Sequence, residues 1–371
     1  MRFDLCGRGV LSLVGVDERV AEYVRDQMDP YVPDASCGDA PAVVLEANES
    51  EASRRFVDFQ NPATDGVVTA SDGRRLSIVY RGRACTIPDA LRDDPARFIH
   101  QPGFPIRRIF GSAVRPALQL AALSRKAVAV HSASVEVDGG GVMVAGWSET
   151  GKTETGLAFA EEGAGFLSDK WTILGSDGTL SAFPIRVGVR RWALRYLPRL
   201  RSSLPPVARA QLAVAGLTSV LSRPVRSKRV GDPTAEAIER AVALVDRASL
   251  TLTEVRSAYG RGGERESAAP LRAVAMLTTV PGFDIDVRPA DPAWAARRLA
   301  HSAAFERRRY FALRERARFA LPDESADARE LSIQRERRLL EALLEPVRLL
   351  DVRAPFPTDP RRVAGAIAAE L

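Results

Sequence analysis

Cysteine, histidine and lysine are scarce in this chain of 371 residues. The three cysteines, Cys6, Cys37 and Cys85, are far apart and form no Cys-x-x-Cys pair, so reduced cytosolic thiols are expected rather than a disulfide framework or a zinc site. No run of about 18 apolar residues occurs, and no basic segment followed by an apolar run opens the chain. These absences predict a cytoplasmic protein with no membrane partner.

Signature motifs of several nucleotide- and nucleic-acid-binding classes are also missing. The chain has no Asn-Lys-x-Asp guanine motif and no ABC-type signature, which disfavours a GTPase or a transporter ATPase. The formal net charge is +6, but neither a zinc-finger spacing nor an aromatic RNA-binding motif accompanies it. We therefore attribute the positive charge to solvated arginines on helices and expect no nucleic-acid partner.

A glycine-rich stretch at residues 146–153, GWSETGKT, is the most informative feature present. It fits the phosphate-binding pattern G-x-x-x-x-G-K-[ST], in which backbone N–H groups cradle phosphates, the lysine reaches the terminal phosphates and the hydroxyl binds Mg²⁺. An apolar strand over 142–145 and a helix over 154–161 give this loop its required context. The residues expected to bind nucleotide are Gly146, Trp147, Ser148, Glu149, Thr150, Gly151, Lys152 and Thr153.

Three residues outside this stretch stand at informative distances from it. Asp169 ends the apolar segment 165–168, and Glu154 directly follows the loop threonine. Because parallel strands that flank such a loop strand deliver their last residues to the same edge of the sheet, Asp169 is expected to act as a Mg²⁺ ligand or a base. His131 lies in a second apolar segment before the loop, where it is a candidate for orienting or sharing the base role.

The order of these motifs resembles the HPr kinase/phosphorylase family and its wider kin, which include small-molecule serine kinases, peptide kinases and, distantly, phosphoenolpyruvate carboxykinases. That family shows a His-Gly/Ser-x-x-Val strand, a glycine-rich turn, the loop followed by Glu, and an apolar strand that ends in Asp-Asp. The matching segments are 131–135, 139–142, 146–154 and 167–169, and 183–186 resembles the stretch that follows the acidic motif. The resemblance covers about residues 127–190.

The resemblance implies roles for individual residues. It gives Lys152 and Asp169 catalytic roles, His131 a supporting role, and Thr153, Glu154 and Asp169 contact with Mg²⁺. The family's second acidic residue is Lys170 here, which we expect to stabilise the transferring phosphoryl group as a cation. Two later arginines are candidate substrate contacts, Arg186 first and then Arg190. The signature that serves phosphorylase activity on HPr is not recognisable, so HPr is not the expected substrate.

Periodicity elsewhere predicts further elements. Segments 67–70 and 76–80 flank a turn and predict a hairpin, and 293–318 predicts one long basic helix. The run 307–310 on that helix is interpreted as a solvated face. A basic piece at 223–229 and a helix over 235–245 are expected inside a region of helical periodicity.

Together these patterns predict an α/β fold in four parts. They are an N-terminal mixed α/β domain (1–108), a P-loop kinase core (109–191), a helical insertion (192–265) and a C-terminal α/β part that completes the core (266–371). The expected function is ATP- and Mg²⁺-dependent phosphoryl transfer to a hydroxyl of a peptide or small molecule. A catalytically impaired nucleotide-binding regulator, or an NTPase that only hydrolyses, remains the alternative, and homo-oligomerisation is left open.

Overall fold

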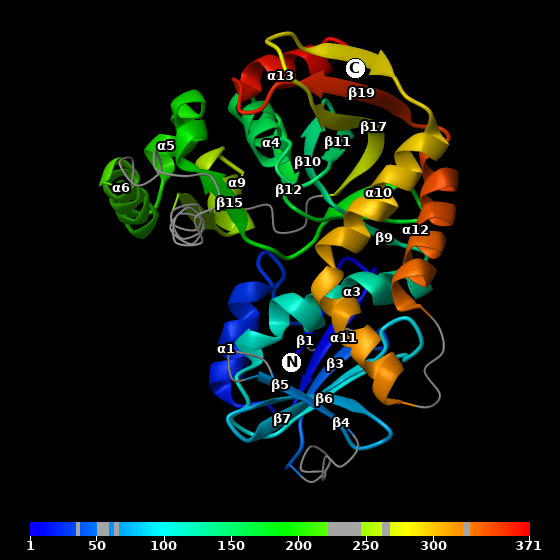
Figure 1. Cartoon of the computed structure of the whole chain (residues 1–371). Helices are drawn as coiled ribbons and strands as arrows, with labels where there is room; N and C mark the ends of the chain where they lie inside the picture. The colour runs from blue at the N-terminus through cyan, green and yellow to red at the C-terminus, as the bar shows by residue number, and fades with distance from the viewer. Residues whose placement is uncertain (35–37, 50–58, 63–66, 222–245, 262–267, 322–326) are drawn as a thin grey trace, which may run out of the picture.

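The computed structural model describes residues 1–34, 38–49, 59–62, 67–221, 246–261, 268–321 and 327–371. Within them the chain forms a mixed α/β structure with two large sheets (Figure 1). The basic piece predicted at 223–229 and the helix predicted over 235–245 lie outside the described residues.

The first sheet is built from the N-terminal hundred residues. Its strands are β1 (Arg2–Asp4), β2 (Val10–Val14), β3 (Val43–Ala47), β4 (Phe59–Pro62), β5 (Val67–Ser71), β6 (Leu76–Tyr80), β7 (Arg83–Ile87) and β8 (Ala96–His100). They lie in the order β1-β2-β3-β8-β7-β6-β5-β4, with β2, β3 and β8 parallel. The antiparallel β5–β6 hairpin confirms the prediction for 67–80.

The second sheet has nine strands and carries the glycine-rich loop. They are β9 (Val128–Val130), β10 (Ser132–Val137), β11 (Gly140–Gly146), β12 (Gly165–Ser168), β13 (Thr172–Leu174), β14 (Thr179–Ala182), β17 (Ala268–Thr279), β18 (Asp286–Pro289) and β19 (Arg348–Ala354). The order is β12-β10-β11-β17-β14-β13-β9, with β19 beside β17 and β18 beside β19.

The position of β12 corrects one detail of the sequence-based expectation. This strand does not flank β11, because β10 lies between them and pairs antiparallel with both. Two antiparallel steps restore the original direction, so β12 still runs the same way as β11 and ends at the same edge of the sheet. The direct parallel neighbour of β11 is β17, which comes more than a hundred residues later in the chain.

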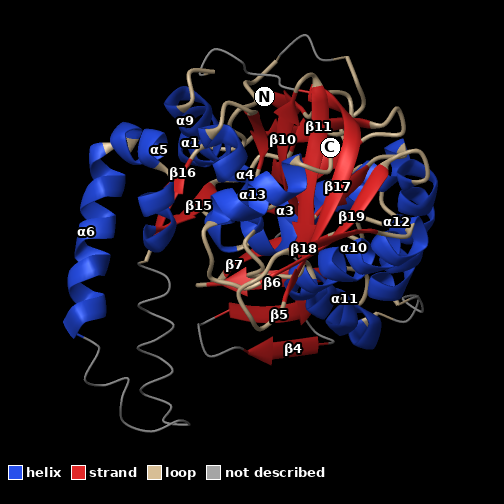
Figure 2. Cartoon of the chain, turned by 90° about the horizontal axis from the view of Figure 1, so that it is seen from above, coloured by secondary structure: helices blue, strands red, loops and turns tan. Residues whose placement is uncertain are grey.

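Helices pack between the sheets and on the outer face of the second sheet (Figures 1 and 2). Those between the sheets are η1 (Ile106–Arg108), η2 (Phe110–Val114), α3 (Arg115–Ala121), η3 (Ala122–Arg125), α10 (Pro292–Glu306), α11 (Arg308–Ala320) and α12 (Ala328–Leu344). Helices α4 (Lys152–Glu161) and α13 (Pro360–Ala368) cover the outer face, while α1 (Glu18–Gln27) packs on the first sheet. One cluster of buried apolar side chains runs from the first sheet through the helices between the sheets to the second sheet.

The long helix predicted over 293–318 is two helices, which is a correction. Helix α10 ends at Glu306, and α11 begins at Arg308 after a turn at Arg307. The interpretation of 307–310 as a solvated face is also wrong for Arg307 and Tyr310, which are buried. Arg307 is held by Gln119, by the carbonyl of Ala129 and by Glu336, so its guanidinium bonds to groups inside the core instead of to water.

A smaller unit projects beside the second sheet (Figures 1 and 2). It contains a two-stranded antiparallel ribbon, β15 (Val187–Arg190) and β16 (Arg247–Leu250). Its helices are η4 (Arg191–Tyr196), α5 (Pro198–Ser203), α6 (Pro206–Leu221) and α9 (Leu252–Ala258). The helices agree with the periodicity of this region, but the ribbon was not predicted.

Candidate functional site

The loop from Gly146 to Thr153 joins the end of β11 to the start of α4. Both of its glycines have backbones that other residues rarely adopt, because Gly146 has φ 147° and Gly151 has φ 93°. A Cβ on Gly146 would lie 2.5 Å from the carbonyl oxygen of Leu277, and one on Gly151 would lie 3.2 Å from the Phe356 ring. Glycine at both positions therefore lets the loop pass closely between β17 and the segment after β19.

A cavity of about 260 Å³ opens beside this loop, and we call it the loop cavity. Apart from loop residues 148–151, it brings together eight residues that the sequence singled out: His131, Lys152, Thr153, Glu154, Asp169, Lys170, Arg186 and Arg190. Loop residues 148–151 also line it. Residues from several different elements thus converge at one edge of the second sheet, where β11 and β12 end.

Lys152 opens helix α4 and is almost fully buried, with 6 % of its surface exposed. Its ammonium donates a hydrogen bond to the carbonyl of Trp147, inside the same loop. Burial lowers the pKa of Lys152 to about 8, although the nearby carboxylates of Asp169, Glu306 and Glu154 oppose the shift. The loop therefore encloses the Lys152 ammonium, and burial of this charge costs free energy unless an anion binds beside it.

Thr153 and Asp169 meet directly, since the threonine hydroxyl donates to the Asp169 carboxylate at 2.7 Å. This places two oxygens side by side next to the loop. Mg²⁺ in proteins is commonly held by one or two such ligands, with substrate phosphates and water completing the octahedron. The pair therefore fits a magnesium ion that is shared with a phosphate group. Among the described residues, no group of three or more His, Cys, Asp or Glu side chains is arranged to hold a metal by itself.

Two carboxylates near the loop, those of Asp169 and Glu154, have raised pKa values because they are buried. The pKa of Asp169 is raised by burial, against the Thr153 hydrogen bond, the backbone N–H of Lys170 and the two lysine charges. Burial also raises the pKa of Glu154, with Arg190 opposing it from 3.7 Å. A carboxylate whose proton affinity is increased is suited to accept a proton from a reacting hydroxyl.

His131 lies between β9 and β10 and is buried against α10. Its Nδ1 is 2.9 Å from the hydroxyl of Ser302, and that hydroxyl donates to the carbonyl of Gly146 at 3.1 Å. Because the one hydroxyl proton of Ser302 is used there, we assign the Nδ1 proton to His131, which leaves its Nε2 as an acceptor. Burial, reinforced by Lys152, Lys170 and Arg307, lowers the pKa of His131 well below its usual value, so the ring is neutral at pH 7.

Lys170, the residue that replaces the family's second acid, lies at the rim of the loop cavity. Its backbone is left-handed, with φ 61°, and its ammonium is 3.8 Å from the Glu306 carboxylate. The side chain is 48 % exposed, whereas that of Glu306 is 12 % exposed. The cation is therefore held at the rim by an acid from the end of α10.

The arginine-bearing ribbon β15–β16 supplies another wall of the loop cavity. Arg186 lines it but is tied to Asp26 of α1 at 2.9 Å, whereas Arg190 reaches the loop itself and contacts Glu149 at 2.7 Å. Arg247, from the facing strand, contacts the same Glu149 carboxylate at 3.0 Å. The ribbon thus places cationic groups against the loop.

Besides Ile185 and Gly188, four residues of this region were not singled out from the sequence as site residues. They are Arg247, Ser302, Glu306 and Phe356. Phe356 lies in a Pro-Phe-Pro segment, 355–357, directly after β19. The other three lie about 100 to 155 residues after the loop and are brought to it by sheet pairing and by α10, which no local pattern encodes.

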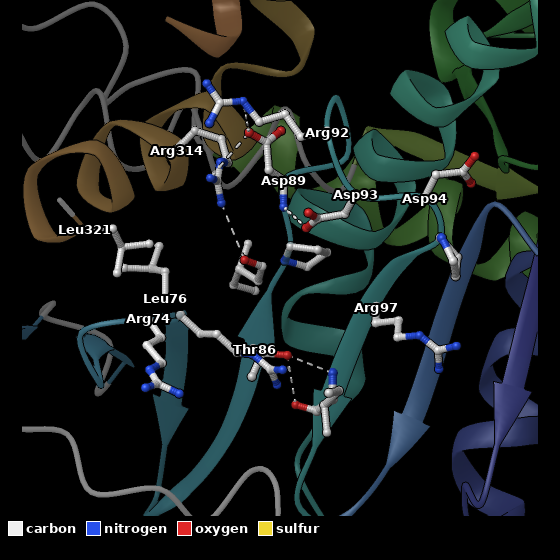
Figure 3. Close-up of a pocket in the computed structure, with 15 residues that line it drawn as sticks. Arg74, Leu76, Thr86, Asp89, Arg92, Asp93, Asp94, Arg97, Arg314 and Leu321 are labelled. Carbon is white, nitrogen blue, oxygen red and sulfur yellow. Dashed lines mark hydrogen bonds and ion pairs between the residues drawn. The ribbon is translucent and has the colours of Figure 1, made fainter. Parts of the chain in front are cut away.

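Two other cavities differ in character. One of about 640 Å³, the α10 cavity, lies on the other side of the loop between the end of β17 and α10, where the half-exposed Trp147 ring packs 4.6 Å from that of Phe305. Another of about 560 Å³ lies between α11 and the first sheet (Figure 3). Arg314 and Arg92 both pair with Asp89 there, at 3.6 and 3.7 Å, and none of the predicted site residues lines it.

The shifted pKa of Lys152 predicts a dependence of stability on pH. Because its folded pKa of about 8 lies below the ordinary 10.5, the unfolded chain binds more protons between these values. Stability from this group therefore rises as pH increases through that window. We expect the unfolding free energy of wild type, relative to Lys152→Met, to increase by about 2–3 kcal/mol between pH 7 and pH 10. Urea denaturation of both proteins measures this change. If the difference in unfolding free energy does not vary with pH, the pKa of Lys152 is that of an ordinary lysine.

Comparison with known proteins adds no assignment, since neither a scan against protein-family models nor a search of curated proteins found a match. Within the part of the chain that the structure describes, no helix is both long and apolar enough to cross a membrane.

Proposed function

We propose that this protein is an ATP-dependent kinase that transfers a phosphoryl group to a hydroxyl of a peptide or small molecule, with an HPr-kinase-like P-loop core. One observation carries the proposal. A glycine-dependent loop leads into α4 with a buried lysine at its start, while the next residue, Thr153, bonds to Asp169 from another strand end. The lysine that would hold the phosphates, the two oxygens that would bind the metal and the carboxylate that would act as base are therefore adjacent.

In this proposal the parts of the site divide the work. Phosphates of ATP lie along the loop and at the N-terminus of α4, whose cap residue Gly151 offers no side-chain hydrogen bond to the first turn. Lys152 turns from the Trp147 carbonyl to the terminal phosphates. The nucleoside lies in the α10 cavity, where the Trp147 ring is available for stacking.

Thr153 and Asp169 would hold Mg²⁺, whose chemistry is to neutralise charge on the phosphate oxygens. Asp169 would also accept the proton of the attacking hydroxyl. His131, neutral and bonded to Ser302, is positioned to orient or share that role. Phosphoryl transfer needs positioning and charge neutralisation more than covalent help from the protein, and these residues supply both.

Lys170 separates this proposal from its rival, a catalytically impaired nucleotide-binding regulator. In the kinase, Lys170 supplies positive charge near the transferring group, so both Lys170→Ala and Lys170→Asp should lower ADP release from ATP by about tenfold. The expected loss is modest because Lys170 is half exposed and already paired with Glu306. A coupled-enzyme assay of wild type and both variants is the test. An inactive wild type, with activity gained in Lys170→Asp alone, would instead establish the regulator.

A further inference from the structure

Glu149 holds an unusual position inside the glycine-rich loop. Its backbone φ is 64°, in the left-handed region that side chains other than glycine, asparagine and aspartate adopt at a cost. Its side chain is 64 % exposed, yet the carboxylate is not free in solvent. The same oxygen, Oε1, contacts Arg190 at 2.7 Å and Arg247 at 3.0 Å. An acid thus projects from a phosphate-binding type of loop onto two cations.

The two arginines are direct neighbours across the β15–β16 ribbon. Arg190 and Arg247 are Cα partners in its register, so two positive charges face each other on adjacent strands. Like charges at directly opposite positions destabilise a strand pair, unless an anion lies between them. In this structure Glu149 provides that anion. The pair is therefore a site built for negative charge, which the protein fills with its own side chain.

Other charges around the pair leave this site cationic. Glu154 is 3.7 Å from the Nε of Arg190 but is itself buried in the loop cavity. Arg186, nearby on the chain, is occupied by Asp26 at 2.9 Å and by Glu254 at 4.0 Å. Displacement of Glu149 would leave two guanidinium groups with one partly shared carboxylate, and guanidinium groups bind carboxylates and phosphates in a bidentate manner.

We propose that Arg190 and Arg247 form a second anion-binding site, which receives a carboxylate or phosphate of the acceptor molecule and which Glu149 occupies until the acceptor arrives. This inference rests on the proposed kinase function. The proposed kinase function assigns the phosphates of ATP to the loop, α4 and Lys152, whereas the arginines come from a separate ribbon that lines the same cavity. The acceptor is then a hydroxyl compound that also carries an anionic group near that hydroxyl.

The transfer itself balances with these groups. The acceptor hydroxyl oxygen forms a bond to the γ-phosphorus of ATP while the bond from that phosphorus to the β,γ-bridging oxygen breaks. The hydroxyl proton passes to Asp169, and ADP is the leaving group. The arginine pair takes no part in bond making, since it holds the anionic end of the acceptor so that the hydroxyl faces the phosphorus.

Isothermal titration of inorganic phosphate into protein saturated with Mg²⁺ and the non-hydrolysable analogue AMP-PNP tests this site. We expect phosphate to bind the nucleotide-loaded protein, and Glu149→Gln to tighten that binding by about tenfold because the competing carboxylate charge is removed. Arg247→Gln should weaken it by a similar factor. Glu162→Gln removes the same charge from the exposed end of α4 and should change nothing.

Contrary outcomes separate this inference from the function on which it rests. Equal phosphate affinity in wild type and Glu149→Gln would overturn the second anion site. Phosphate binding that disappears once AMP-PNP is bound would overturn it too, since the arginines would then hold the phosphates of the nucleotide, and the kinase proposal would stand. A protein that does not bind AMP-PNP would overturn the kinase proposal itself and this site with it.

Discussion

Asp169→Asn should lower the turnover of ATP by about 10²–10⁴-fold, the range expected when a proton acceptor is lost. The amide keeps the shape of the carboxylate and can still accept the hydrogen bond from Thr153, but it cannot take a proton at neutral pH. Burial, which raises the pKa of Asp169, is what makes this carboxylate an effective base. ADP release under saturating ATP and Mg²⁺ measures the effect.

The matched control for this variant is Asp138→Asn. Asp138 is an exposed residue with φ 48° in the turn between β10 and β11, a conformation that asparagine adopts readily. It should leave turnover unchanged. Nucleotide affinity should be nearly intact in Asp169→Asn, so a loss of binding there would mean that metal ligation, rather than proton transfer, is the main task of this residue.

Glu336→Ala should lower the free energy of unfolding by about 3–5 kcal/mol, because it leaves the buried guanidinium of Arg307 without its carboxylate. Both side chains of this pair have 0 % exposed surface, and they form a direct ion pair between α12 and the α10–α11 turn. Gln119 and the carbonyl of Ala129 also accept from Arg307, but neither carries a charge. Urea denaturation followed by circular dichroism measures the loss.

A second acid on the same helix gives the comparison. Glu341 pairs with Arg337 at 3.3 Å, with both side chains more than one-third exposed, so Glu341→Ala should cost less than about 1 kcal/mol. Replacing both buried partners, as in Arg307→Met with Glu336→Leu, should recover much of the stability that Glu336→Ala loses. Equal effects of Glu336→Ala and Glu341→Ala would mean that the buried pair does not hold α12 in place.

The loop and its immediate neighbours were accessible to sequence reasoning because they form one local strand–loop–helix unit. The glycines at 146 and 151 and the lysine at 152 are encoded within eight residues, and Asp169 follows on the next apolar segment. The α/β class was likewise visible in alternating apolar segments. The sequence pattern did not predict that the antiparallel strand β10 lies between β11 and β12, because register and the order of neighbouring strands depend on long-range pairing.

The remaining site residues, and the buried Arg307 of the core, were hidden for the same physical reason. Glu306 and Ser302 lie on α10, whose periodicity reports only which face is buried and not which cavity it borders. Arg307 looked like part of a solvated basic run, because arginine is usually exposed and its buried partner, Glu336, is 29 residues away. Arg247 follows a stretch of ordinary helical periodicity, so no local sequence pattern predicted that it would pair with Arg190 across two strands.

Direct titration of Mg²⁺·ATP into the purified protein by calorimetry tests the central claim most directly. Wild type should bind with one site per chain, and Lys152→Ala should weaken binding by about 10–100-fold, because a charge-assisted contact to the phosphates is lost. Lys126→Gln is the control, because it replaces another of the four lysines at a position that does not line the loop cavity. This variant should bind Mg²⁺·ATP like wild type. Binding that is absent in wild type, or equally strong in Lys152→Ala, would contradict the assignment of the glycine-rich loop as a nucleotide site.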